Sequence, residues 1–176
     1  MEDMRKEFGD EVTELVDGVT KLSVLKFESK EERQAENLRK MFLAMSKDIR
    51  VLIIKLADRL HNLRTINYMT HEKIIEKCQE TLDIYGPLAA RLGIYSMKME
   101  LEDIALKFLE PEAYYDLAEQ VSERKEERED AIEAIIDKMK KALDEIGINY
   151  EVYGRSKHFY SIYKKMKYQH KNIDEI

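Results

Sequence analysis

The residue types best suited to chemistry lie on one predicted helix, residues 49–65, with the sequence IRVLIIKLADRLHNLRT. At about 100° per residue, Asp58, Asn62 and Thr65 fall on one stripe, opposite a stripe of leucine and isoleucine. Val51 and Ile54 continue the polar stripe towards the N-terminus, so the helix is apolar almost all round and we expect it to be buried. Asp58 would then lie in an enclosed place, where a carboxylate needs a cation or several hydrogen-bond donors.

Two interpretations of Asp58 follow from this spacing. In the first, Asp58 is a buried structural carboxylate held by Arg59, Arg64 or a neighbouring helix, because buried carboxylates are usually paired. In the second, Asp58 is a metal ligand or a catalytic carboxylate, and Asn62 and Thr65 bind a substrate beside it. Spacing alone does not decide between them.

A second candidate site lies near the C-terminus. Six Lys or Arg residues and no Asp or Glu fall within residues 152–173, whereas the whole chain carries a net charge of −6. A basic segment on an acidic protein favours a local anion site. On a helix predicted from about residue 156 to 168, Lys157, Ser161, Lys165 and Tyr168 share one face, and Arg155 precedes it. A phosphate would gain from the amides of the helix N-terminus, but a solvated lysine face is the simpler interpretation of the pattern alone.

The composition indicates helices as the elements that position these residues. The 176 residues include 44% apolar and 38% charged residues, with only 6 Gly and 2 Pro, which favours a soluble and mainly helical protein. No apolar run approaches the roughly 18 residues of a membrane span. The single cysteine, Cys78, excludes an internal disulfide and is most simply a small core residue of a cytoplasmic protein.

Hydrophobic spacing and breaker residues predict the other elements. We expect a short helix that stops at Gly18, a helix that begins at about Ser46 as its N-cap, and a bend or break at Gly86-Pro87. Ile148, Tyr150 and Val152 alternate with polar residues and predict the one strand. Further helices are predicted over residues 30–45, 72–92, 96–109, from Pro111, and from about residue 130 to Gly147.

Several segments, in order along the chain, resemble the RelA/SpoT homologue family, whose enzymes make and degrade the alarmone (p)ppGpp in the stringent response. They are VDGVTKLS (residues 16–23), AENLRKMFLAM (35–45), KLADRLHNLRT (55–65), PLAARLGIY (87–95), MELED (99–103) and GRSKHFYSIYKKM (154–166). The resemblance covers essentially the whole chain. It implies a mainly α fold: the C-terminal part of an HD-type helical hydrolase bundle (1–120), a connecting helix (121–147), and the first βα unit of an α+β nucleotidyltransferase-like synthetase domain (148–176).

The resemblance also implies roles for the two candidate sites. Asp58 matches the last metal-ligand Asp of a Mn²⁺ site that hydrolyses the 3′-pyrophosphate of (p)ppGpp, and Asn62 and Thr65 match positions in its nucleotide pocket. In the synthetase domain, pyrophosphate passes from ATP, with Mg²⁺, to the 3′-hydroxyl of GDP or GTP. The residues that match the family's contacts to the ATP phosphates are Arg155, Lys157, Ser161 and Lys165.

Both sites are expected to be incomplete within this sequence. In the family, the other hydrolase ligands precede the segment that matches residue 1, and the synthetase carboxylate follows the segment that matches residue 176. We therefore expect an internal fragment of a cytoplasmic bifunctional enzyme that acts on (p)ppGpp, GDP or GTP and ATP, and an isolated chain that catalyses neither reaction. No DNA or membrane partner is expected; a homo-oligomer is left open, and ribosome association is not readable from this segment.

Two alternatives remain. The chain could be a non-enzymatic module that binds a nucleotide or a partner, or a different HD-type phosphohydrolase that takes its missing ligands from another chain.

Overall fold

The computed structural model describes residues 1–23, 48–123 and 125–175 of the chain. Two compact units make up this chain, Met1–Leu109 and Glu110–Ile176. In the first unit the elements are α1 (Glu2–Ser23), α3 (Ile49–Arg64), the 3₁₀ turn η1 (Ile66–Tyr68), α4 (His71–Glu80), the π-helical turn η2 (Thr81–Tyr85), α5 (Gly86–Arg91) and α6 (Tyr95–Leu109). In the second they are α7 (Pro111–Glu123), α8 (Lys125–Ile146), α9 (Phe159–Gln169) and the 3₁₀ turn η3 (Ile173–Glu175).

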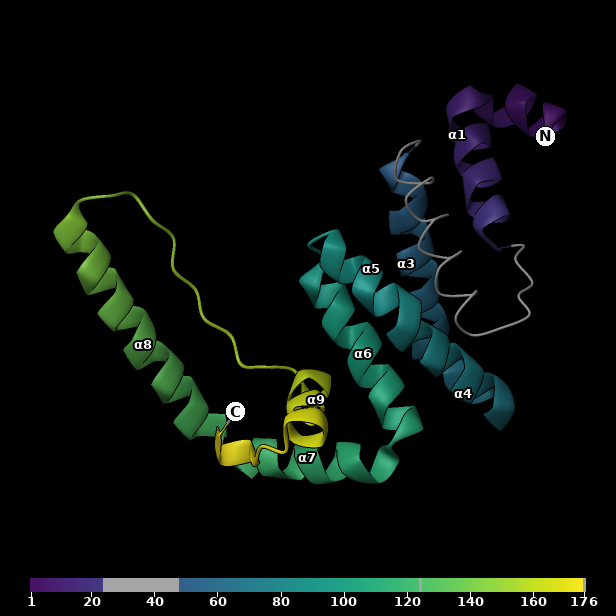
Figure 1. The fold of residues 1–176 in the computed structure, drawn as a ribbon. Helices are drawn as coiled ribbons and strands as arrows, with labels where there is room; N and C mark the ends of the chain where they lie inside the picture. Colours follow the sequence, from purple (N-terminus) through teal and green to yellow (C-terminus); the bar gives the residue numbers. More distant parts are fainter. Residues whose placement is uncertain (24–47, 124, 176) are drawn as a thin grey trace. The chain divides into compact units, whose positions relative to one another are not determined.

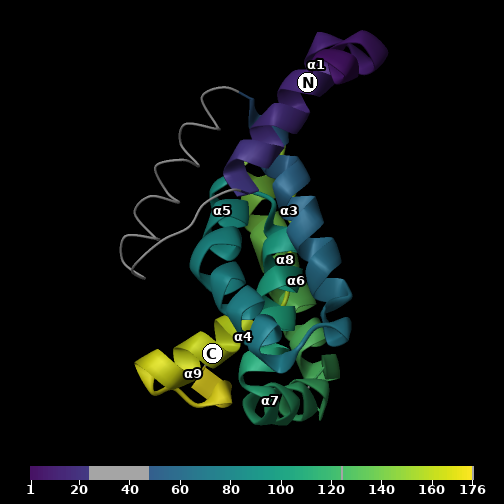
Figure 2. The same ribbon diagram turned by 90° about the vertical axis from the view of Figure 1, so that its right-hand side faces the viewer.

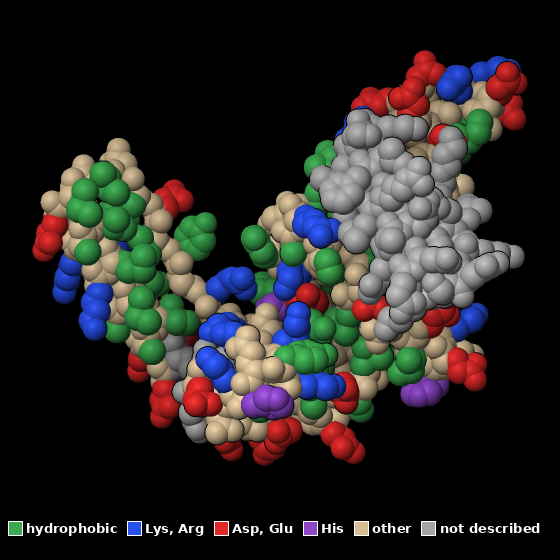
Figure 3. Space-filling view, viewed as in Figure 1, with side chains coloured by type: hydrophobic (Ala, Val, Ile, Leu, Met, Phe, Trp, Pro, Cys, Tyr) green, Lys and Arg blue, Asp and Glu red, His purple; other side chains and the backbone are tan. Residues whose placement is uncertain are grey.

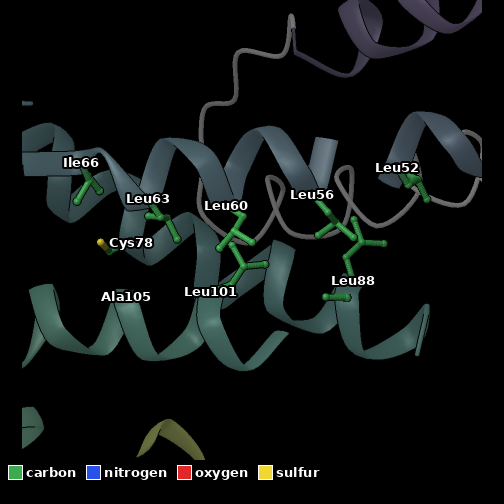
Figure 4. Packing of buried hydrophobic residues seen from close by; sticks show 10 residues of the cluster. Leu52, Leu56, Leu60, Leu63, Ile66, Cys78, Leu88, Leu101 and Ala105 are labelled. Carbon is green, nitrogen blue, oxygen red and sulfur yellow. The ribbon is translucent and has the colours of Figure 1, made fainter. Parts of the chain in front are cut away.

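The core of the first unit lies between α3, α5 and α6, which run close together in both ribbon views (Figure 1, Figure 2). The leucines of α3 at heptad-like spacing face Leu88 of α5 and Leu101 and Ala105 of α6 (Figure 4). The core leucines of α3 are Leu52, Leu56, Leu60 and Leu63, each at most 8% exposed. Their spacing of three and four residues is that of one helix face, so the predicted helix at residues 49–65 is confirmed.

The N-terminal helix differs from the prediction. It kinks at Gly9, where φ is 80°, and then continues through Gly18 to Ser23. Gly18 is therefore no helix stop. A Cβ atom built on Gly18 would lie 2.8 Å from Cγ2 of Val51, so glycine at this position lets α1 approach α3 closely. The N-cap of α3 is Asp48, whose carboxylate accepts a hydrogen bond from the Arg50 amide at 2.8 Å. The predicted cap Ser46 and the predicted helix 30–45 lie outside the described residues.

The predicted interruption at Gly86-Pro87 takes the form of a π-helical turn. The Gly86 amide donates to the Thr81 carbonyl five residues earlier. Pro87 has no N–H group to continue an α-helical ladder, and the helical path resumes as α5. Pro111 opens α7, and Gly147, with φ of 72°, follows the end of α8, as predicted.

The predicted strand at residues 148–152 is wrong for the structure described here. Residues 147–158 follow an irregular path, and α9 begins at Phe159 rather than near residue 156. A strand is stable only when it pairs with a neighbour, and the described part of the chain has no other strand. The irregular segment lies against α8 instead, where a Cβ atom on Gly154 would meet Ile132 Cγ2 at 2.6 Å. Hydrophobic side chains run along α8 (Figure 3).

Within the described ranges, no helix combines the length and the apolar character needed to cross a membrane.

Candidate functional site

Asp58 lies on an open face of α3, contrary to the enclosed position that its apolar neighbours predicted. Its side chain is 54% exposed. Ile54, on the same stripe, is 42% exposed, whereas Val51 is buried against α1. The two apolar residues of this stripe therefore have different surroundings: Val51 is covered by α1, whereas Ile54 is partly exposed to solvent. The sequence alone could not distinguish these two surroundings, because Val51 and Ile54 are both β-branched and apolar.

Among the described residues, the partners of Asp58 belong to its own helix. Its Oδ1 accepts a hydrogen bond from Asn62 Nδ2 at 3.3 Å, and its Oδ2 lies 3.5 Å from Lys55 Nζ. Thr65 lies one turn after Asn62 and caps the C-terminal end of α3, and its hydroxyl donates to the His61 carbonyl at 3.1 Å. The three predicted residues Asp58, Asn62 and Thr65 thus lie in succession along one accessible face.

The two arginines expected beside Asp58 bind other carboxylates. Arg64 makes a two-pronged ion pair with Glu100 of α6, at 2.5 and 2.7 Å. Arg59 is 7% exposed, and its Nη2 donates to Glu80 Oε2 at 2.6 Å. The Arg59 guanidinium also lies 4.1 Å from the centroid of the Tyr85 ring in the π-helical turn. The interpretation of Asp58 as a buried structural carboxylate is therefore wrong.

Burial acts to lower the pKa of Arg59, but Tyr85 and Glu80 outweigh it and the pKa is raised. Arg59 is thus a cation that ties α3 to α4 and the π-helical turn. The sequence carried no sign of this role, because Glu80 and Tyr85 lie more than twenty positions after Arg59, on other elements.

The second unit contains a hollow of about 440 Å³ at the start of α9. All four residues predicted to contact ATP phosphates line it, namely Arg155, Lys157, Ser161 and Lys165. Its other lining residues are Ser156, His158, Lys164, Tyr168 and Gln169. Lys and Arg side chains gather over α9 (Figure 3). The helix-face pattern included Tyr168 but missed Lys164. Lys164 belongs to the basic segment and lies one helical turn after Ser161, and these two facts could have indicated it.

The local backbone opens the first turn of α9 towards this hollow. His158 is extended, with φ of −76° and ψ of 160°, and its carbonyl accepts the amides of Ser161 and Ile162 at 3.1 and 3.2 Å. The Ser161 hydroxyl lies 3.2 Å from the His158 ring nitrogens. Helix N-termini leave amides without helical acceptors and carry a partial positive charge. Together with four cationic side chains, this arrangement suits a multiply charged anion.

Comparison with known proteins places these residues in a family. A family model described as "HD domain" matches residues 1–95, which is more than half of the chain. The chain belongs to the HD-domain family. The matched residues of the HD domain include Asp58, Asn62 and Thr65, whereas the hollow at α9 lies beyond them.

Curated relatives match almost the whole chain. It is 51% identical to a GTP pyrophosphokinase of Myxococcus xanthus over 99% of its length and 24% of the relative. It is 50% identical to a probable guanosine-3′,5′-bis(diphosphate) 3′-pyrophosphohydrolase of Synechocystis over 96% of its length and 22% of the relative. It is 46% identical to the bifunctional (p)ppGpp synthase/hydrolase SpoT of Escherichia coli over 99% of its length and 25% of the relative.

The resemblance to the RelA/SpoT family is thereby confirmed. These relatives are named as enzymes that act on GTP or on guanosine bis(diphosphate). The chain spans about a quarter of their length.

An HD-domain hydrolase suggests a divalent metal, but the described residues do not make up its site. No group of three or more His, Cys, Asp or Glu side chains that could hold a metal occurs among them. Asp58 offers one carboxylate, and useful affinity for such metals takes several ligands. The hollow at α9 likewise has no carboxylate among its lining residues.

Proposed function

We propose that this chain is part of an enzyme of (p)ppGpp metabolism that carries both synthetase and hydrolase segments. The proposed reactions of the whole protein are pyrophosphoryl transfer from ATP to the 3′-hydroxyl of GDP or GTP, and hydrolysis of the 3′-pyrophosphate of (p)ppGpp. Support comes from relatives with both kinds of name that match nearly all of the chain. We assign residues 1–120 to the hydrolase domain, 121–147 to a connecting helix and 148–176 to the synthetase domain.

The observation that carries the synthetase assignment is the basic hollow at α9. Arg155 and Lys157 reach it from the irregular segment, and Ser161 and Lys165 reach it from the helix. Phosphoryl transfer relies mainly on positioning and on neutralising the charge of the phosphates. We propose that these four residues bind the phosphates of ATP, which enters with Mg²⁺.

The hydrolase assignment rests on the accessible stripe of α3. We propose that Asp58 contributes one carboxylate to a Mn²⁺ site completed by residues outside this sequence. The Asn62 amide already holds Asp58 by a hydrogen bond, so it can orient the carboxylate, and Asn62 and Thr65 are proposed to line the nucleotide pocket. The whole protein is proposed to act in the cytoplasm.

For the isolated chain we propose binding without turnover, because the anion hollow is assembled here and a metal-ligand cluster is not found among the described residues. Its test is calorimetric titration with ATP and with inorganic tripolyphosphate. Lys157→Ala and Lys165→Ala should each weaken binding about ten-fold, the effect of losing one charge-assisted hydrogen bond. Lys171→Ala is the matched control, because Lys171 is an exposed cation of the same segment that does not line the hollow.

Two results would contradict this proposal. Equal affinities of the Lys157→Ala, Lys165→Ala and Lys171→Ala variants would show that binding follows overall charge and not the hollow. Release of pyrophosphate from ppGpp by the isolated chain, abolished by Asp58→Ala, would show that the chain completes a hydrolase site by itself.

A further inference from the structure

Helix α9 presents two different faces to its surroundings. Ser161, Lys164, Lys165 and Tyr168 line the hollow. The opposite face packs on α7, with Ile162 fully buried and the Phe159 ring edge-on to Tyr114 at 5.3 Å between centroids. The lining residues come from α9 and from the segment just before it, so the packing on α7 holds the helix that contributes most of the lining.

Polar contacts at the border of the packed face join α9 to the residue that precedes α7. The Tyr163 hydroxyl donates to Glu110 Oε1 at 3.0 Å. Lys167 Nζ donates to the same oxygen at 2.9 Å and to the Tyr163 hydroxyl at 2.6 Å. Each of these groups thus contacts the other two, and we name this closed set the Glu110 clasp.

Both ends of the clasp are anchored. The Glu110 carbonyl accepts the Tyr114 amide at 2.9 Å in the first turn of α7, and Pro111 follows directly. Tyr163 and Lys167 are one helical turn apart on α9 and are therefore neighbours on its surface. Hydrogen bonds from Lys167 and Tyr163 hold the pKa of Glu110 below its ordinary value. The hydrogen bonds of Lys167 to Tyr163 and to Glu110 raise the pKa of Lys167.

The clasp also separates the lysines of α9 by role. Lys164 and Lys165 line the hollow, whereas Lys167 is not among its lining residues and is engaged with Glu110. A count of basic residues in the segment would treat all of them as equivalent.

We propose that Glu110, Tyr163 and Lys167 are positioning residues that fix α9 on α7 and so present Ser161, Lys164 and Lys165 to a polyphosphate ligand. The polyphosphate ligand rests on the proposed function, whereas the fixing of α9 on α7 does not.

The first test measures amide hydrogen exchange over residues 159–168 in the 176-residue chain. Glu110→Gln keeps the side-chain size but removes the charge, and it should speed exchange there about five-fold, as expected for the loss of one net hydrogen bond. Glu119→Gln is the matched control, because Glu119 is an exposed carboxylate of α7, the helix that follows Glu110, and it is not part of the clasp. Unchanged exchange in Glu110→Gln would overturn the inference, whether or not any nucleotide binds.

The second test is a double-mutant cycle in tripolyphosphate binding. Glu110→Gln and Tyr163→Phe should each weaken binding about three-fold, and the double variant should be little worse than either alone, because both remove one unit. Additive losses in the double variant would contradict the clasp. If wild-type chain binds no tripolyphosphate, the proposed function fails, while the exchange measurement still decides whether the clasp fixes α9.

Discussion

At the scale of single residues, the charged side chains of α3 are distinguished by their partners. Arg59 and Arg64 each bind a carboxylate on a different element, whereas the contacts of Asp58 with described residues lie within its own helix. The first two therefore hold α3 in place, and the third is left accessible on the surface. Adjacent positions in the sequence thus have unrelated roles, which residue type and spacing do not reveal.

The Arg64–Glu100 pair gives a pH dependence with a definite sign. Hydrogen bonds from Arg64 hold the pKa of Glu100 below its ordinary value. A depressed folded-state pKa contributes stability above the unfolded pKa of about 4.3, and this is lost as the pH falls through the folded value. Arg64→Ala should therefore lower the urea midpoint slightly at pH 7, with the difference from wild type vanishing towards pH 3.

The size of this effect should be small, because both side chains are partly exposed and exposed ion pairs contribute little. Lys73→Ala, which removes an exposed cation from α4, is the control. A difference between wild type and Arg64→Ala that persists unchanged at pH 3 would mean that Arg64 acts through packing and not through Glu100.

At the scale of the elements, the contact of α1 with α3 depends on one glycine. Gly18 lies inside a helix, where glycine costs about 1 kcal/mol relative to alanine. It is retained at the point where a side chain would press on Val51. The stiff, β-branched valine cannot turn away easily, so the close approach of the helices offsets the intrinsic cost of glycine.

The close contact between Gly18 and Val51 predicts different effects of Gly18→Ala in two backgrounds. In the chain with Val51, Gly18→Ala should lower stability or leave it unchanged, because the clash cancels the gain in helix propensity. In the Val51→Ala background the same change should raise the free energy of unfolding by about 1 kcal/mol. Urea denaturation of the four proteins measures this, and equal effects in both backgrounds would refute the close contact.

The same elements show how far the sequence alone could lead. The core face of α3, the Pro111 start of α7 and the Gly147 end of α8 were predictable, because local spacing and backbone chemistry determine them. The passage of α1 through Gly18 was not, because it depends on a neighbour 33 positions away, Val51. Alternation at residues 148–152 predicted a strand, but pairing decides whether a strand forms.

In the candidate site, too, local sequence predicted some features and distant neighbours determined others. Four of the residues that line the hollow, Arg155, Lys157, Ser161 and Lys165, were named from the matching motif, but their convergence from an irregular segment and a helix required the fold. The exposure of Asp58 and the contact of Glu110 with residues more than fifty positions later were beyond any local pattern.

At the scale of the whole molecule, the described residues of the first unit pack around the hydrophobic cluster of α3, α5 and α6, and the fully buried Cys78 is part of it. Burial raises the pKa of the Cys78 thiol to about 11. Because the thiolate is the reactive form, the thiol should react at pH 8 only when the unit opens.

We therefore expect labelling of Cys78 by a thiol reagent at least about 100-fold slower in the native chain than in urea. Leu101→Ala removes a fully buried side chain of the same cluster, at a cost of about 2–5 kcal/mol, and should speed native labelling strongly. Lys73→Ala, an exposed change, should leave the rate unaltered. Rapid labelling of the native wild-type chain would show that this core is open to solvent.

The π-helical turn between α4 and α5 has a consequence for chain length. A π-helical turn holds one residue more than an α-helical turn, so Thr81–Tyr85 carries one surplus residue between two helices. Deleting it would join α4 and α5 in one α-helical path, which would still lack the hydrogen bond that Pro87 cannot donate. Everything after the deletion would turn by about 100°, however, which would carry Leu88 and Ala89 out of the core they now fill. The number of residues here is therefore fixed by what lies after the turn, and not by any side chain within it.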